Sequence, residues 1–216
     1  MQEWKMHQYN ILIGCDQSYY DDWAVTLLKS IQRHNPHIVL HCHIVNPTKH
    51  NVLSSVSITT EDKTFSSVES KISYLQSVRF LAVANKFSKN ENVITLDADS
   101  ICTRAISKSE LELLFKNQYV LKHHKDNRWL AGFIAFLDNG FRQEYAAELQ
   151  SNSVDTWLWG RDQTVLNALA QNYDFCTLSK TWMSIGKIRQ HSAFLTLKGE
   201  QKTTNKYLGV YRKYLE

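Results

Sequence analysis

The sequence predicts a single α/β domain over residues 1–216, with a mixed, mainly parallel central sheet flanked by helices. Three observations favour this fold class. Apolar strand-like runs alternate with helical patterns along the first half of the chain, which is typical of βαβ units. Gly (7) and Pro (2) are scarce, which argues against linkers and long disordered segments. The hydrophobic fraction of 43% is sufficient for a sizeable core.

The first βαβ unit is expected near the amino end. An apolar run over residues 11–14 ends at a glycine and predicts a buried strand. A helix follows, with Asp21 or Asp22 as its expected N-cap, and stops at Asn35. A second strand is expected over residues 37–45. Because the two strands are joined through a helix, we expect them to be parallel.

A long helix dominates the next part of the chain and is expected over residues 67–89. Four residues share one face of it: Ile72, Leu75, Arg79 and Ala82. The other elements are expected in this order: a short strand near 56–58 before that helix, strands at 93–96, 119–122, 130–137, 175–178 and 183–185, and helices at 109–116, 141–149 and 162–171.

Composition limits the function classes. The net charge of +4 lacks the dense Lys/Arg stripe of a dedicated nucleic-acid binder, but it suits anionic small ligands such as nucleotides. The four cysteines are widely spaced without a C-x-x-C pair, which argues against a zinc knuckle or disulfide framework and fits a reducing compartment. The amino end lacks the apolar run of a secretory signal, and no stretch is long enough to span a bilayer. We expect a soluble, cytoplasmic protein without a transmembrane segment; no oligomeric state is predicted.

Two carboxylates follow the strand expected at 93–96, in the run Val-Ile-Thr-Leu-Asp-Ala-Asp. In an open α/β sheet, ligands bind beyond the carboxyl ends of the strands, where the strand order reverses. Because one residue separates Asp97 from Asp99 on an extended chain, both side chains point the same way. Such a pair can hold Mn²⁺ or Mg²⁺, directly or through water. The alternative from the residues alone is a turn, which Asp often starts after a strand.

The segment YLQSVRFLAVANKFSKNENVITLDADSIC resembles the GT-A fold glycosyltransferases, especially glycosyltransferase family 8, the glycogenin-like and bacterial galactosyl- and glucosyltransferase group. The resemblance extends over roughly residues 9–200. It implies a single GT-A (Rossmann-like) domain with a nucleotide-binding half (about 1–105), a donor-sugar and acceptor half (about 106–200) and a short basic-aromatic tail (201–216).

The resemblance also implies roles for residues of the long helix and the acidic pair. In that family the two aspartates bind Mn²⁺ under the diphosphate of a nucleotide sugar, which implies this role for Asp97 and Asp99, with Ala98 between them in the donor site. Arg79 matches the arginine that reaches the donor. Independently of the family, an Arg on an apolar helix face either meets an anion or extends to solvent.

Three later segments agree with the resemblance. WLAGFIAFLDNG implies a place for Gly132 beside the donor sugar, although the Asn typical of the family's turn is missing. WGRDQTVLNAL implies that Asp162 and Gln163 face the sugar; alternatively, Asp162 starts a helix and complements its dipole. IRQHSAFLTLKG resembles the family's carboxy-terminal His followed by Lys, where the usual run is Gly-x-x-Lys-Pro-Trp. This match implies His191 as a third metal ligand, which favours Mn²⁺ over Mg²⁺, and Lys198 as a diphosphate contact.

The amino-terminal segment YNILIGCDQSYY resembles the family's first strand and loop, which hold the nucleoside. It implies donor contacts from four residues: Ile13, Gly14, Asp16 and Tyr19. The ring of Tyr19 either stacks on the base or packs under the loop.

Three other features have structural alternatives. His41 and His43 share one face of a strand, and a partly exposed edge strand is preferred to a metal pair. Trp157 or Trp159 either supplies a sugar-stacking platform or fills the core. The tail is expected to pack back on the domain.

The resemblance therefore implies metal-dependent transfer of a hexose from UDP-glucose or UDP-galactose to a saccharide, lipid or protein hydroxyl, with retention. If the enzyme inverts, Asp162 is the candidate general base. Two rival classes remain. A haloacid-dehalogenase-type phosphatase needs Thr or Val where this chain has Ile101, and carries its Asp-x-Asp near the amino end. A non-catalytic nucleotide-sugar binder would retain the same acids.

Overall fold

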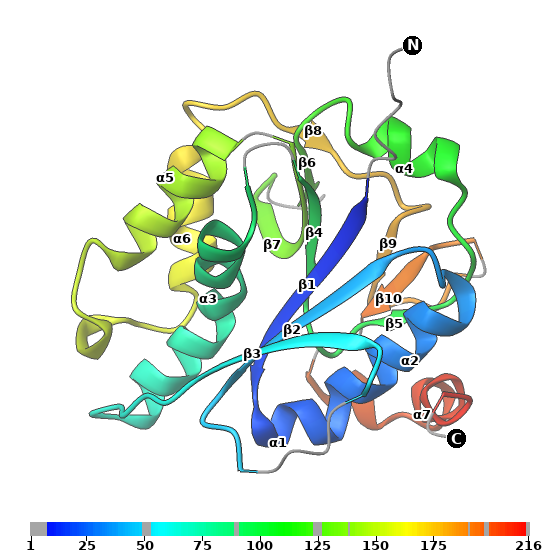
Figure 1. The fold of residues 1–216 in the computed structure, drawn as a ribbon, viewed down its shortest axis with the longest axis horizontal. Coiled ribbons are helices and arrows are strands. Elements are labelled where there is room, and N and C mark those ends of the chain that lie inside the picture. The colour runs from blue at the N-terminus through cyan, green and yellow to red at the C-terminus, as the bar shows by residue number, and fades with distance from the viewer. Residues whose placement is uncertain are drawn as a thin grey trace.

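A seven-stranded sheet forms the centre of the computed structural model, which describes residues 8–48, 53–88, 91–122, 127–137, 139–189, 191–196 and 199–214 (Figure 1). Its strands are β3 (Val56–Glu61), β2 (Val39–Val45), β1 (Tyr9–Asp16), β4 (Asn92–Leu96), β7 (Trp129–Phe136), β6 (Tyr119–Lys122) and β8 (Cys176–Thr177), in that spatial order. β1 pairs in parallel with β2 and β4, whereas β7 is antiparallel to both β4 and β6. The predicted mixed, mainly parallel sheet is confirmed.

A second sheet of three short strands lies beside the first. It comprises β5 (Ile101–Cys102), β10 (Phe194–Thr196) and β9 (Met183–Ile185). The sequence predicted β9 but neither β5 nor β10, because runs of two or three residues carry almost no periodic signal.

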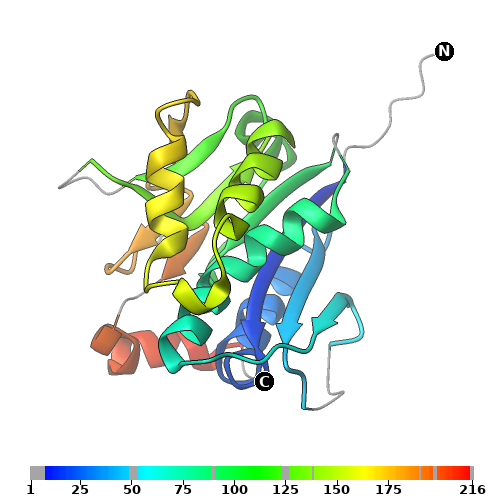
Figure 2. The ribbon, with the colours of Figure 1, turned by 90° about the vertical axis from the view of Figure 1, so that its left-hand side faces the viewer.

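The helices form two layers around the large sheet. They are α1 (Gln17–Tyr19), the π-helical turn η1 (Tyr20–Ala24), α2 (Val25–His34), α3 (Val68–Lys86), α4 (Lys108–Leu114), α5 (Asn139–Gln150), the 3₁₀ turn η2 (Val154–Thr156), α6 (Arg161–Leu169), the 3₁₀ turn η3 (Gly199–Thr203) and α7 (Asn205–Arg212). α3, α5 and α6 cover one face, and α2, α4 and the small sheet cover the other (Figures 1 and 2). None of the helices built from the described residues combines the length and apolarity that a membrane crossing requires.

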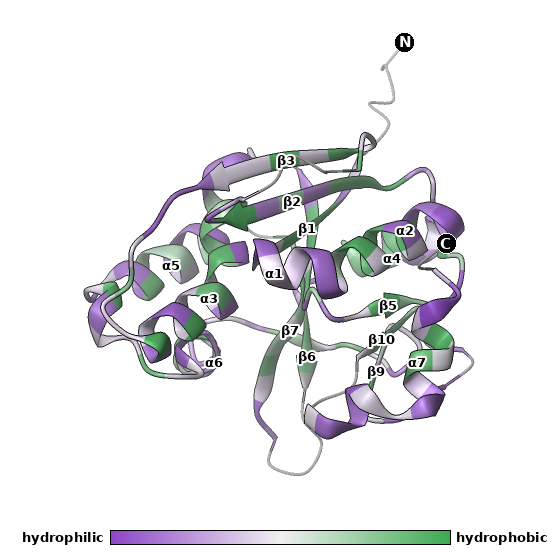
Figure 3. Ribbon diagram, turned by 90° about the horizontal axis from the view of Figure 1, so that it is seen from below, coloured by the Kyte–Doolittle hydropathy of each residue, from purple (hydrophilic) through white to green (hydrophobic). Residues whose placement is uncertain are grey.

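The central strands are buried on both faces, so their sequences are nearly continuous apolar runs. Alternate residues of β1 enter different cores: Ile11 and Ile13 pack with α2, whereas Leu12 packs with α3. In β4, Ile94 enters the core on the α2 side, whereas Val93 enters the core on the α3 side. Figure 3 shows these apolar strands between the two helical layers.

The start of the first helix differs from the prediction. The N-cap is Asp16, whose carboxylate accepts a hydrogen bond from the Tyr19 amide at 3.0 Å, and not Asp21 or Asp22. The chain enters α1 directly from β1 and passes through the π-helical turn η1 before α2. Asp21 lies within that turn and accepts a bond from Gln17 instead.

The tail packs on the domain, as expected. Within α7, Tyr207 and Tyr211 are buried against Ile101 and Leu195 of the small sheet. The Tyr211 hydroxyl donates to the carbonyl of Asp22. These contacts hold the carboxy-terminal segment beside the ends of β1 and β4.

His41 is a core residue, and the expectation that its strand forms a sheet edge is wrong. β2 lies between β1 and β3, and Nε2 of His41 is 3.0 Å from Oδ1 of Asn10. The Asn10 amide group donates to the carbonyl of Asn92, so its oxygen faces the imidazole and Nε2–H is the donor. Nδ1 is buried without a hydrogen-bond partner among the described residues. Protonation would leave that N–H⁺ unpaired, and burial lowers the pKa of His41 to about 4.

This buried imidazole predicts acid sensitivity. The unfolded chain takes up the proton near pH 6.5 and the folded chain only near pH 4, so the free energy of unfolding should fall as pH drops through that window. The difference corresponds to up to about 3 kcal/mol. Urea denaturation at several pH values should show a shallower decline for His41→Gln than for the parent. The exposed-site control His37→Gln should keep the parent's decline; equal pH dependence of His41→Gln and the parent would contradict this account.

Gly14 permits a close approach between β1 and α3. A Cβ at this position would lie 2.8 Å from Cγ1 of Val78 and 2.9 Å from the backbone nitrogen of Arg79. Any side chain would therefore push α3 away from the end of β1, and Arg79 would move with it.

We expect Gly14→Ala to lower the free energy of unfolding by about 1–3 kcal/mol, because overpacking against backbone cannot be relieved by a rotamer change. Gly209→Ala is the matched control: no atom lies within 4 Å of its added Cβ, and alanine favours the helix by up to about 1 kcal/mol. Urea denaturation measures both. A Gly14→Ala protein as stable as the parent would show that the approach is not constrained.

Candidate active site

The candidate site lies where the strand order of the large sheet reverses. The chain leaves β1 for β2 and β3 on one side and returns to β4 on the other, so a crevice forms beyond the carboxyl ends of β1 and β4. A cavity of about 660 Å³, here called the first cavity, opens at this point. Seven predicted site residues line it: Gly14, Asp16, Tyr19, Arg79, Asp97, Ala98 and Asp99.

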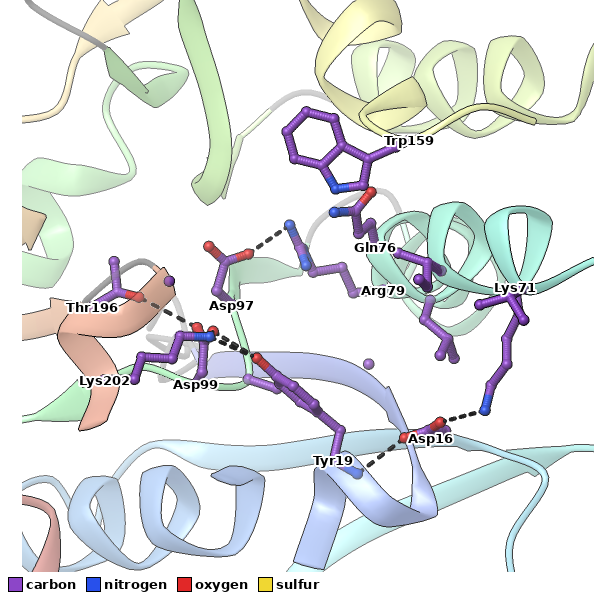
Figure 4. A pocket seen from close by; sticks show the side chains of 16 residues that line it. Asp16, Tyr19, Lys71, Gln76, Arg79, Asp97, Asp99, Trp159, Thr196 and Lys202 are labelled. Carbon is purple, nitrogen blue, oxygen red and sulfur yellow. Dashed lines mark hydrogen bonds and ion pairs between the residues drawn. The ribbon is translucent and has the colours of Figure 1, made fainter. Parts of the chain in front are cut away.

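Arg79 lies between two carboxylates. Its Nη2 is 2.9 Å from Oδ1 of Asp97 (Figure 4). The same atom lies 3.7 Å from Oδ2 of Asp162 and donates to the carbonyl of Ala131 at 3.1 Å. The side chain is only 6% exposed. A buried guanidinium requires such partners, since an unpaired charge there would cost several kcal/mol, on the order of the penalty for any buried ion. Of the two alternatives left open by the sequence, Arg79 meets anions, here the carboxylates of Asp97 and Asp162, and does not extend to solvent.

Asp99 is held by groups from both ends of the chain. Its carboxylate accepts hydrogen bonds from the Tyr19 hydroxyl at 2.6 Å and from Oγ1 of Thr196 at 3.3 Å, and forms an ion pair with Lys202 (Figure 4). The Tyr207 hydroxyl of α7 donates to the Asp99 carbonyl at 2.8 Å. Burial and the Asp99 carboxylate raise the pKa of Tyr19, so its hydroxyl remains a donor at neutral pH.

Lys202 brings a positive charge from the tail into this site. Besides Asp99, its Nζ contacts the Tyr19 hydroxyl at 3.0 Å and lies over the rings of Tyr19 and Trp23 at 5.7 and 5.5 Å. Sequence reasoning missed Lys202. The spacing of Gly199 and Lys202 matches the Gly-x-x-Lys part of the Gly-x-x-Lys-Pro-Trp run described above. This spacing could have identified Lys202 from the sequence.

The structure does not bring His191 to the acidic pair. His191 is exposed, lines neither cavity, and offers its carbonyl to Arg104 at 3.0 Å. It precedes β10, whereas Thr196 ends that strand and reaches Asp99. Five residues of extended chain span up to about 16 Å, so the two positions lie at opposite ends of the strand. Lys198, the other residue predicted from this segment, lies outside the described residues.

Asp16, at the end of β1, lines the first cavity together with Lys71 of α3. One oxygen of Asp16 caps α1, and the other pairs with Lys71 of α3 at 2.9 Å. Further along the same wall, Ile72 and Leu75 face the cavity. Ile72, Leu75 and Arg79 of the predicted helix stripe thus form a cavity wall, and Leu75 also packs against the core beneath it.

A second cavity of about 340 Å³ adjoins the first and shares Arg79 and Asp97 with it. Gly132, Asp162 and Gln163 line this second cavity, as do parts of β7. A Cβ at Gly132 would lie 2.6 Å from Oδ2 of Asp97, so only glycine allows this carboxylate its place. The Asp97 amide donates to the Gly132 carbonyl at 3.1 Å.

Gln163 holds an irregular part of β7. Val120 pairs with Ile134 and the next residue, Leu121, pairs with Leu130, so residues 131–133 form a bulge without partners in β6, although Phe133 still pairs with Leu96 of β4. Oε1 of Gln163 accepts from the Ala131 amide at 3.3 Å, and its Nε2 donates to the carbonyl of Trp129. The amide of Gln163 is thus engaged with backbone in this structure and supports the bulge that carries Gly132.

The sequence left two roles open for Asp162, a position in the ligand site and a helix start, and its carboxylate is placed for both. Its Oδ1 accepts from the Gln163 amide at 2.8 Å in the first turn of α6, while Oδ2 lies near Arg79 in the second cavity. The carboxylate therefore complements the helix dipole and still lies at the cavity wall. Ile13, by contrast, is fully buried in the core and its side chain lines neither cavity.

The oxygen donors near the acidic pair fit a divalent cation. Asp97, Asp99 and the hydroxyl of Thr196 supply oxygen atoms only, which Mg²⁺ and Mn²⁺ both accept. Within the described part of the chain, no three His, Cys, Asp or Glu side chains gather closely enough to hold a metal ion. Remaining coordination positions would therefore fall to water or ligand oxygens, as is usual for Mg²⁺.

Comparison with protein-family models and with curated proteins gives no match. Among solved structures, the fold is similar to that of the glycosyltransferase GlyE of Streptococcus pneumoniae TIGR4, with a TM-score of 0.67 at 15% identity over 96% of this chain and 60% of GlyE. The apo form of GlyE gives a TM-score of 0.68. The bifunctional glycosyltransferase WbbM gives 0.60 at 14% identity over 100% of this chain and 53% of WbbM. This chain thus spans little more than half of each neighbour and has the fold of solved glycosyltransferases.

Proposed function

We propose that this chain is a glycosyltransferase that moves a hexose from a nucleotide sugar to a hydroxyl group of an acceptor. One observation carries the proposal: Asp97 and Asp99 line a cavity at the switch point of the sheet, each paired with a cation. The volume of about 660 Å³ is in the range of small-molecule sites. The similarity in fold to GlyE and WbbM also supports the proposal of glycosyl transfer.

Charge balance supports a divalent cation in this function. The described residues that line the two cavities carry as many carboxylates as cations, four of each: Asp16, Asp97, Asp99 and Asp162 against Lys71, Arg79, Arg128 and Lys202. A diphosphate would add further negative charge in a partly buried site, where unbalanced charge is costly. We therefore propose Mn²⁺ or Mg²⁺ as cofactor, held by Asp97 and Asp99 with Thr196. When bound, the ion would stabilise the negative charge that develops on the leaving diphosphate.

The donor would extend from the amino-terminal half of the chain into the second cavity. We assign the nucleoside to the region of Gly14, Asp16 and Tyr19, with the apolar wall of α3 opposite, and the hexose to the region of Gly132 and Asp162. Uridine as the base, and glucose or galactose as the hexose, follow from the family resemblance. The two proposed halves and the tail thus contribute to one site.

The proposed reaction exchanges one bond at the anomeric carbon for another. The bond from C1 to the diphosphate oxygen breaks, the acceptor oxygen bonds to C1, and the hydroxyl proton passes to a phosphate oxygen of the departing nucleotide. Arg79 and Lys202 would stabilise the departing charge electrostatically. Because the leaving phosphate acts as the base on the same face of the sugar, the configuration at C1 is retained.

Release of UDP from UDP-glucose and UDP-galactose tests this proposal. We expect release that requires Mn²⁺ or Mg²⁺, stops with a chelator, and falls by at least about 100-fold in Asp99→Asn, which loses a charge that faces the cation site. Asp174→Asn is the matched control, since Asp174 is exposed and lies outside both cavities. Thermal unfolding of each variant checks that the fold persists.

Two outcomes would contradict the proposal. Release of inorganic phosphate from simple phosphomonoesters, without UDP release, would favour a phosphatase. Metal-dependent binding of UDP without turnover of either donor would favour a non-catalytic binder.

A further inference from the structure

Trp159 is a large aromatic side chain exposed at the wall that the two cavities share. Its exposed fraction is 73%, and it lines both the first and the second cavity. In Figure 4 it lies with Gln76 at the end of the site that holds the Arg79–Asp97 pair, away from Asp16 and Tyr19. Trp157, two residues earlier, is buried in the core. The two tryptophans of this segment therefore have different roles.

The backbone that carries Trp159 is fixed on both sides. Oγ of Ser73 donates to the carbonyl of Leu158 at 2.7 Å, and the amide of Gly160 donates to Oε1 of Gln76 at 3.2 Å. Gly160 has φ = +79°, a conformation that glycine adopts without strain and that turns the chain into α6. Leu158 and Gly160, which flank Trp159, are both hydrogen-bonded to α3. The backbone that carries the indole is therefore held rigidly by that helix.

Polar groups surround the apolar surface of this indole. Gln76 and Thr164 line the second cavity beside it, and Nε2 of Gln76 donates no hydrogen bond to any described residue. The same cavity continues to Gly132 and Asp162, where the proposed hexose would lie. A ligand that fits here needs an apolar face with hydrogen-bonding groups at its edges.

We propose that Trp159 is the stacking platform of the acceptor subsite and that the acceptor is a saccharide. This inference rests on the proposed function. One face of a pyranose presents C–H groups with a partial positive charge, which the negative face of an indole attracts, while its hydroxyls extend at the rim toward Gln76 and Thr164. A hydrocarbon chain at this position would leave Nε2 of Gln76, which donates to no described residue, without a hydrogen-bond partner, which is unfavourable. The stacked ring would direct a hydroxyl along the second cavity toward the hexose.

Ligand-observed saturation-transfer NMR tests the subsite, with the protein saturated with UDP and Mg²⁺. The probes are methyl β-glucoside, methyl β-galactoside, maltose and lactose. We expect at least one saccharide to bind the parent with the strongest transfer at the C–H protons of one face, Trp159→Ala to weaken it at least tenfold, and Trp159→Phe to restore part of the binding. Leu158→Ala is the control, because Leu158 is also exposed (66%) but lines neither cavity.

The results separate this inference from the proposed function. If the parent binds none of the four saccharides, or if Trp159→Ala binds them as well as Leu158→Ala does, the stacking role is overturned. UDP release from the donors by the parent is measured in parallel, with and without each of the four saccharides. Donor turnover together with unaltered saccharide binding in Trp159→Ala would refute the acceptor subsite alone, whereas absence of donor turnover would refute the proposed function.

Discussion

Two carboxylates held one residue apart at the end of a buried strand repel each other, and the structure offsets this repulsion with one cation from each side. Arg79 of α3 pairs with Asp97, and Lys202 of the tail pairs with Asp99. The first cation is buried and is shared with Asp162, which fixes α6 relative to β4. The second comes from the carboxy-terminal segment, whose Tyr207 and Tyr211 also pack on the small sheet. The acidic pair thus joins α3 and the carboxy-terminal segment beside the end of β4.

Backbone packing gives these charges their positions. Gly14 lets α3 approach the end of β1, and Gly132 leaves room for the carboxylate of Asp97 above the bulge of β7. Gln163 ties that bulge to α6, and Tyr207 ties α7 to the carbonyl of Asp99. The charged groups are therefore carried by strand ends and helices, which hold a site more rigidly than loops do. A ligand entering the first cavity would meet groups already in place, with Lys202 and Asp99 as the pair that has to adjust.

The sequence predicted the long elements, because apolar periodicity is a local signal. Asp97, Asp99 and Arg79, which the family resemblance assigned to the donor site, line one cavity in the structure, and their roles stay predictions. Features that depend on contacts between residues far apart in the sequence could not be predicted from local signals. Thr196, which the sequence analysis did not single out, reaches Asp99 where His191 does not, because the register of β10 depends on its pairing with β5 and β9. Likewise, the helix that Asp16 caps continues into a π-helical turn, and the amide of Gln163 bonds to a bulge, and neither irregularity has a reliable sequence signature.

The most direct test is a crystal structure of the protein with a non-hydrolysable UDP-hexose analogue and Mn²⁺. We predict an anomalous peak for manganese between the carboxylates of Asp97 and Asp99, the diphosphate in the first cavity, and Nζ of Lys202 moved from Asp99 to a phosphate oxygen. A complex in which the nucleotide lies elsewhere, or in which Lys202 still pairs with Asp99 and no manganese peak adjoins the acids, would contradict the account.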